Sequence, residues 1–196
     1  MSTSAKQGSL TLSLLPSVIL YGVAVALILL TRQGTSGMLP YWQVFVLLAA
    51  FISLLSGFRQ AYVNDRSRIM YMIKQIIHWG ILVGALWLWQ TQSVTSGLGE
   101  AKYTLVLMYL LAISSITAGL YLDFRTLFFG IFMGICAYLL TASANLAILA
   151  PIGKTLHVAD PTTKPVTMIA VMALVAFALS TFFLLTQRGS VAAKRG

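Results

Sequence analysis

The sequence predicts an all-α integral membrane protein, a polytopic bundle of six transmembrane helices with both termini in the cytoplasm. The 196-residue chain is 59% apolar, and only 9% of its residues are charged, against about 25% in an ordinary soluble domain. Six apolar stretches are each about as long as the ~20 helical residues that cross a hydrocarbon core of ~30 Å. The basic residues flank these stretches and do not gather in one run.

The six predicted spans use most of the chain and leave no room for a soluble catalytic domain. We therefore expect a single transmembrane domain over residues 1–196, in contact with the lipid bilayer. The spans in chain order are 10–30, 41–58, 69–89, 103–122, 126–149 and 166–185.

Local signals support the borders of the spans. The first apolar run is too long for a secretory signal peptide and lacks a small-x-small cleavage site, so we expect a permanent helix with Pro16 in its first turns. Interfacial aromatic residues open or close the second, third and fourth spans. These residues are Tyr41, Trp42, Trp87, Trp89 and Tyr103.

The connections between the spans differ on the two sides of the membrane. The connection 59–68 is short and basic, and its apolar spacing suggests that the helices run past the membrane edge and turn near Asn64 and Asp65. The connection 123–125 is tighter still, so both predict antiparallel helical hairpins. The opposite connections are rich in Gly, Ser, Thr and Pro. The segment 150–165 contains three prolines, which predicts an irregular cap there.

The distribution of basic residues predicts the orientation. With the termini inside, nine cations are cytoplasmic and four lie outside, which favours this orientation under the positive-inside tendency. The inner cations are Lys6, Arg59, Arg66, Arg68, Lys74, Arg125, Arg188, Lys194 and Arg195, and the outer ones are Arg32, Lys102, Lys154 and Lys164. We expect a bacterial cytoplasmic (inner) membrane. Because the cations are scattered, the net charge of +9 does not indicate nucleic-acid binding.

Small residues four positions apart predict where helices pack closely. In lipid, apolar side chains gain little by leaving the acyl chains, so close backbone contact drives helix association. Such pairs are Gly80 with Gly84, Ser115 with Gly119, and Gly130 with Gly134. They predict contacts inside one bundle or, alternatively, a docking face for a partner or a second copy.

Few residues inside the spans can carry chemistry. Lys74 and His78 share one helix face near the inner end of the third span, and Thr141 and Asn145 share a face in the fifth. These four residues are the candidate polar face of a solute path. The simpler interpretations are that Lys74 snorkels to the headgroups and that His78 is hydrogen-bonded to a neighbouring helix. Thr141 and Asn145 would then form interhelical hydrogen bonds.

Missing groups weigh against several functions. No acidic residue lies in the middle of a span, although carboxylates usually couple ion-driven carriers. The chain has no nucleotide-binding, hydrolase or metalloprotease motif, and two histidines and one cysteine give a metal or haem little to bind to. We therefore expect no enzyme, no cofactor and no metal site.

The favoured hypothesis is a non-enzymatic membrane subunit, an assembly, scaffold or input component that acts through a membrane protein partner or as a homo-oligomer. The alternative is a small oligomeric carrier or channel for a small solute or ion.

Overall fold

A computed structural model describes residues 10–34, 37–63, 68–141, 146–155 and 165–193. This part of the chain is all-helical and contains no strand. Its helices are α1 (Leu10–Arg32), α2 (Leu39–Val63), α3 (Arg68–Thr91), α4 (Val94–Leu98), α5 (Glu100–Tyr121), α6 (Phe124–Thr141), α7 (Leu146–Thr155) and α8 (Pro165–Ala193).

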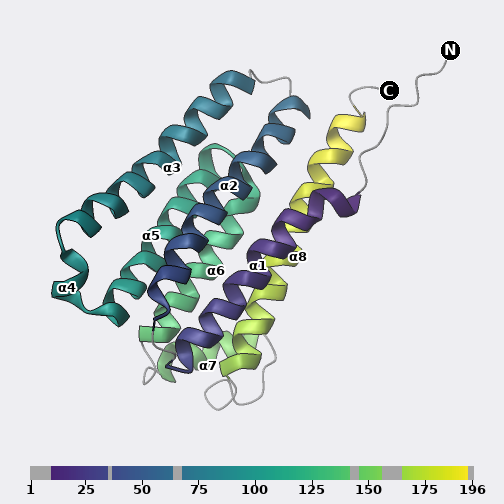
Figure 1. Cartoon of the computed structure of the whole chain (residues 1–196). Coiled ribbons are helices and arrows are strands. Elements are labelled where there is room, and N and C mark those ends of the chain that lie inside the picture. Colours follow the sequence, from purple (N-terminus) through teal and green to yellow (C-terminus); the bar gives the residue numbers. More distant parts are fainter. Residues whose placement is uncertain (1–9, 35–36, 64–67, 142–145, 156–164, 194–196) are drawn as a thin grey trace.

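The length and apolar composition of the helices make the chain an integral membrane protein. Five helices, α1, α2, α3, α5 and α8, are long and apolar enough to cross a bilayer. The sixth apolar helix, α6, is shorter and its 18 residues rise about 27 Å. All six run roughly along one direction in the bundle (Figure 1).

The bundle has a central pair of helices with the others packed around it. Helices α5 and α6 pack together most extensively, α8 lies against α6 and α1, and α2 lies against α3, α1 and α5. Figure 1 shows α3 at one edge of the bundle and α1 with α8 at the other. The core consists of apolar side chains from all six long helices, among them Ile28, Trp42, Phe45, Leu107, Phe132 and Met168.

The two ends of the bundle differ. Helix α1 begins and α8 ends at the end that carries the α5–α6 hairpin, and α4 and α7 lie at the opposite end (Figure 1). Only Leu122 and Asp123 separate α5 from α6, as the sequence predicts. We call the end with the α5–α6 hairpin the hairpin end, and the end with α4 and α7 the far end.

The fifth predicted span differs from the structure at its C-terminal bound. Helix α6 ends at Thr141 and a separate helix, α7, begins at Leu146 and runs to Thr155. The prediction of an irregular cap over 150–165 is therefore wrong for residues 150–155. Helix α7 contains Pro151. Because proline has no backbone N–H, the helix loses one backbone hydrogen bond there.

Candidate functional site

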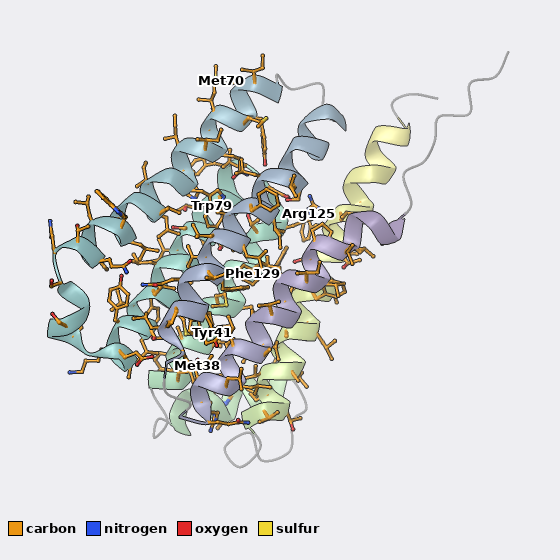
Figure 2. The ribbon with its side chains drawn as sticks, in the orientation of Figure 1. Met38, Tyr41, Met70, Trp79, Arg125 and Phe129 are labelled. Carbon is orange, nitrogen blue, oxygen red and sulfur yellow. The ribbon has the colours of Figure 1, made fainter. Side chains whose placement is uncertain are left out.

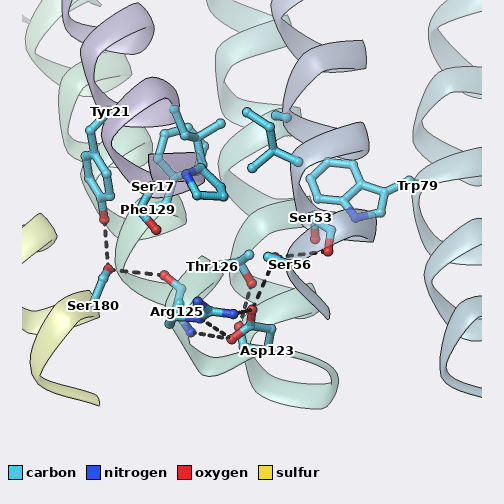
Figure 3. A pocket seen from close by; sticks show the side chains of 14 residues that line it. Ser17, Tyr21, Ser53, Ser56, Trp79, Asp123, Arg125, Thr126, Phe129 and Ser180 are labelled. Carbon is cyan, nitrogen blue, oxygen red and sulfur yellow. Dashed lines mark hydrogen bonds and ion pairs between the residues drawn. The ribbon is translucent and has the colours of Figure 1, made fainter. Parts of the chain in front are cut away.

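Polar side chains from five parts of the chain meet near the hairpin end of the bundle. This inner polar cluster consists of Tyr21 (α1), Ser56 (α2), Asp123 (hairpin), Arg125 (α6) and Ser180 (α8), and Figure 3 shows it at close range. The five side chains line a cavity of about 30 Å³, whose wall also includes Pro16, Ser17, Ser53, Trp79, Thr126 and Phe129. A space of this size holds one or two water molecules.

Asp123 is positioned by the start of α6. It directly precedes the first residue of the helix, and its Oδ1 accepts a hydrogen bond from the backbone N–H of Arg125 at 3.2 Å. The hydroxyl of Thr126 donates to the Asp123 carbonyl at 2.7 Å. This is the geometry of an N-cap, in which a short acidic side chain satisfies a free N–H of the first turn.

The same carboxylate binds the Arg125 guanidinium through both of its oxygens. Nε lies 3.1 Å from Oδ1 and Nη2 lies 2.9 Å from Oδ2. The side chain of Asp123 is 1% exposed and that of Arg125 is 12% exposed. Since an isolated charge at this depth would lose its hydration without compensation, the two-pronged ion pair keeps the site neutral overall.

Hydroxyl groups connect this ion pair to three further helices. The Ser56 hydroxyl lies 3.5 Å from Asp123 Oδ2 and 3.1 Å from the Ser53 carbonyl. On the other side, Ser180 donates to the Arg125 carbonyl at 3.3 Å and lies 3.2 Å from the Tyr21 hydroxyl. A serine hydroxyl has one proton, so Tyr21 is the donor in the last contact. The cluster therefore ties α1, α2 and α8 to the hairpin.

A second polar group lies between α2 and α3. Gln75 has no exposed surface, and its Oε1 accepts hydrogen bonds from Trp79 Nε1 at 2.8 Å and from the Ser53 hydroxyl at 3.4 Å. Its Nε2 donates to the Tyr71 hydroxyl at 2.7 Å. Because three partners satisfy the amide, Gln75 can lie inside an apolar bundle at little cost.

A larger cavity opens at the far end of the bundle. This outer cavity has a volume of about 500 Å³ and is lined by residues from the C-terminal ends of α1 and α6, the N-terminal end of α5, and the connection before α2. Met38, one of its wall residues, lies at the opposite end of the bundle from Arg125 (Figure 2).

Packed apolar side chains separate the two cavities. At intermediate heights of α1, α2 and α6, the buried residues Ala24, Ile28, Trp42, Phe45, Phe132, Met133 and Cys136 are at most 1% exposed. Within the described residues, this layer closes the bundle between the inner polar cluster and the outer cavity.

The structure describes only Lys74 and His78 of the predicted polar face in full. Lys74 is exposed on α3, and His78 Nε2 donates to the backbone carbonyl of Ser114 on α5 at 2.8 Å. Thr141 is the last residue of α6, and its side chain, like the whole of Asn145, lies outside the described part. No contact between the two halves of the predicted face is therefore described.

The predicted packing glycines fall into two groups. A Cβ added at Gly119 would collide with the backbone of Leu127, and one at Gly130 would lie 2.6 Å from the Ile116 nitrogen, so both glycines allow the close crossing of α5 and α6. Ser115 is buried on α5. A Cβ added at Gly134 on α6 would make an ordinary contact with Ala112 at 3.7 Å.

The stripe on α3 is different. A Cβ added at Gly80 or Gly84 would meet nothing within 4 Å, so none of the helices that the structure describes packs closely on these two glycines.

Several residues of the site were not predicted from the sequence. Gln75 lies between Tyr71 and Trp79 at spacings of four, which places three hydrogen-bonding side chains on one face of α3; that spacing was a usable signal. No comparable sequence signal joins Tyr21, Ser56 and Ser180, because they lie on different helices.

The described residues contain no group of three or more His, Cys, Asp or Glu side chains that could hold a metal ion. A comparison with protein-family models, with curated proteins and with solved structures finds no match to this chain.

Proposed function

We propose that this chain is a non-enzymatic multi-pass membrane subunit that acts through a partner membrane protein bound along α3. In this proposal α6 also crosses the bilayer, which gives six spans with both termini in the cytoplasm of a bacterial cell. The arrangement of the bundle supports an even number of crossings, because α1 begins and α8 ends at the hairpin end (Figure 1).

The observation that carries the proposal is the uncovered face of α3. Of the five long helices, α3 has the smallest buried share. Gly80 is exposed and Gly84 is half-buried, one turn apart on this helix, and a Cβ added at either would meet no atom of the described residues within 4 Å. Bulky exposed side chains surround this small-residue groove: Ile69, Met70, Ile73, Ile76, Ile77, Ile81, Trp87 and Leu88.

Glycine at a purely lipid-facing position gives no packing gain. In a helix interior it costs about 1 kcal/mol relative to alanine, and a lipid tail packs as well against larger side chains. Two glycines one turn apart instead let a second helix approach backbone to backbone. In this chain Gly119 and Gly130 serve that purpose between α5 and α6, and we assign the same purpose to Gly80 and Gly84 with a helix of another chain.

Lys74 fits the same face. Its side chain is exposed near the inner end of α3, and the ion pair found among the described residues, between Asp123 and Arg125, does not involve it. It is therefore available to a headgroup or to an acidic residue of the partner.

The carrier hypothesis has less support. A solute path would have to connect the two ends of the bundle, whereas the inner cavity measures only about 30 Å³ and the outer cavity, of about 500 Å³, lies at the far end alone. His78 donates a hydrogen bond to the Ser114 carbonyl, which joins α3 to α5. Packed apolar residues lie between the two cavities.

The experiment is site-specific photo-crosslinking in intact membranes. A photoreactive residue at Ile77 on α3 should give a discrete protein adduct, whereas one at Val18, which is exposed on α1, should not. Introducing Gly80→Leu with Gly84→Leu should remove the adduct and leave the abundance of the protein unchanged, because no intrachain contact is lost.

Gly22→Leu is the matched control, since Gly22 is also a span glycine with nothing within 4 Å, but it is not part of a stripe. In the Gly22→Leu variant, the adduct formed by the photoreactive residue at Ile77 should persist. An adduct that survives Gly80→Leu with Gly84→Leu, or the absence of any adduct on α3, would contradict the proposal; an adduct with the mass of two copies would identify a homo-oligomer.

A further inference from the structure

We propose that the outer cavity is a binding site for a small amphipathic anion, with one carboxylate or phosphate group on an apolar body. This site does not depend on the partner interface proposed for α3. Its volume of about 500 Å³ lies within the ~300–1,000 Å³ of typical small-molecule pockets, which commonly form between the helices of bundles.

The wall of the cavity combines an apolar floor with a cationic edge. Met38, Leu105, Leu139 and Leu140 supply apolar surface, and Arg32 supplies a guanidinium. A ligand that fills this space must therefore present an apolar body to the leucines and a charged or polar group to Arg32. Guanidinium groups bind carboxylates and phosphates through two parallel hydrogen bonds.

The charge of the ligand follows from the two charged residues that the described part of the chain places in the wall, Arg32 and Glu100. Arg32 has no carboxylate within 4 Å among the described residues, and this wall residue is exposed. Glu100, the acidic wall residue, already accepts a hydrogen bond from the backbone N–H of Leu39 at 3.2 Å. The positive ends of α2 and α5 offset its charge, so the guanidinium remains to be neutralised by a ligand.

The position of the cavity determines how the ligand enters. The ends of α1, α5 and α6 and the connection before α2 surround it, and the buried layer around Trp42 and Phe132 lies between it and the hairpin end. The ligand therefore enters from the water at the far end of the bundle and leaves by the same path. This is the geometry of a receptor pocket, since the described residues form no polar route from it toward the hairpin end.

The test measures binding of octanoate to the full chain in nanodiscs of zwitterionic lipid, by isothermal titration against empty discs. Octanol is the neutral control, because it has the same apolar body and also partitions into lipid. We expect saturable binding of octanoate and none of octanol. Arg32→Gln should weaken octanoate binding at least tenfold, and Arg32→Lys should weaken it less.

Lys102→Gln is the matched control, because it removes the same charge from the same end of the bundle and Lys102 is not a wall residue. It should change the affinity less than twofold. Glu100→Gln should strengthen binding, since it removes an anion from the wall while its amide oxygen can still accept from Leu39. All variants should elute like the parent on size exclusion.

Three results would overturn the proposal. Equal binding of octanol and octanoate would show partition into lipid, and equal losses in Arg32→Gln and Lys102→Gln would show unspecific charge attraction. Weaker binding in Glu100→Gln would show that the cavity does not select an anion.

Discussion

At the scale of single residues, Asp123 makes three interactions: it caps α6, neutralises Arg125 and contacts Ser56 on α2. Each interaction requires the charged form or its oxygen atoms, and all take place where the carboxylate is nearly inaccessible to solvent. The residue therefore ties the hairpin geometry to the packing of the neighbouring helices.

The ion pair should behave as a unit. Asp123→Asn keeps an oxygen for the cap but leaves the Arg125 charge without its counter-ion, and we expect a loss of about 3–5 kcal/mol of unfolding free energy. Arg125→Met should cost a similar amount. The double variant Asp123→Asn with Arg125→Met should lose less than the sum, because no buried charge remains unpaired. Thermal unfolding in detergent measures all three, and additive losses would contradict the coupling.

A second residue-scale prediction concerns Gln75. Gln75→Leu removes the acceptor of the Trp79 indole N–H, and Trp79 is buried. An unsatisfied buried donor costs about 1–3 kcal/mol, so the melting temperature should fall by several degrees. Lys74→Met, at the neighbouring exposed position, should leave it unchanged; a larger effect for Lys74→Met than for Gln75→Leu would contradict this account.

At the scale of elements, the glycines of α5 and α6 differ from those of α3. Gly119→Ala and Gly130→Ala would each place a Cβ against the backbone of the facing helix, and such overpacking costs about 1–3 kcal/mol. We expect lower recovery from membranes and lower melting temperatures.

For the isolated chain, Gly80→Ala and Gly84→Ala should be neutral or slightly stabilising, because alanine is the better helix former and the added Cβ meets nothing. Gly22→Ala provides the comparison on α1. If Gly80→Ala and Gly84→Ala destabilised the protein as much as Gly119→Ala and Gly130→Ala, this face of α3 would be covered within this chain.

At the scale of the whole molecule, the predicted orientation places α7 outside and the end of α8 inside. With Cys136→Ala as background, a cysteine introduced at Thr155 should react with an impermeant thiol reagent applied to intact cells. One at Ser190 should react only after the cells are permeabilised. The reverse pattern would invert the topology, and the outer cavity would then face the cytoplasm.

The sequence by itself determined that this is a helical membrane protein, where most of its spans lie and how tightly the α5–α6 hairpin turns. These properties depend on local quantities, namely the length of an apolar run, the residues at its ends and the short polar segment between two runs. The end of the fifth span was harder to locate, because Leu146–Thr155 is also apolar but belongs to a separate helix.

Only the tertiary structure decided which faces meet. In a soluble helix the apolar stripe marks the buried side, but in lipid both sides are apolar and hydrophobicity loses that information. For this reason Gly119 and Gly80 look alike in the sequence, although a Cβ added at Gly119 would meet the α6 backbone and one added at Gly80 would meet no described atom within 4 Å. The buried Gln75 was likewise less conspicuous than the charged Lys74 beside it, because burial depends on helices that are distant in the sequence.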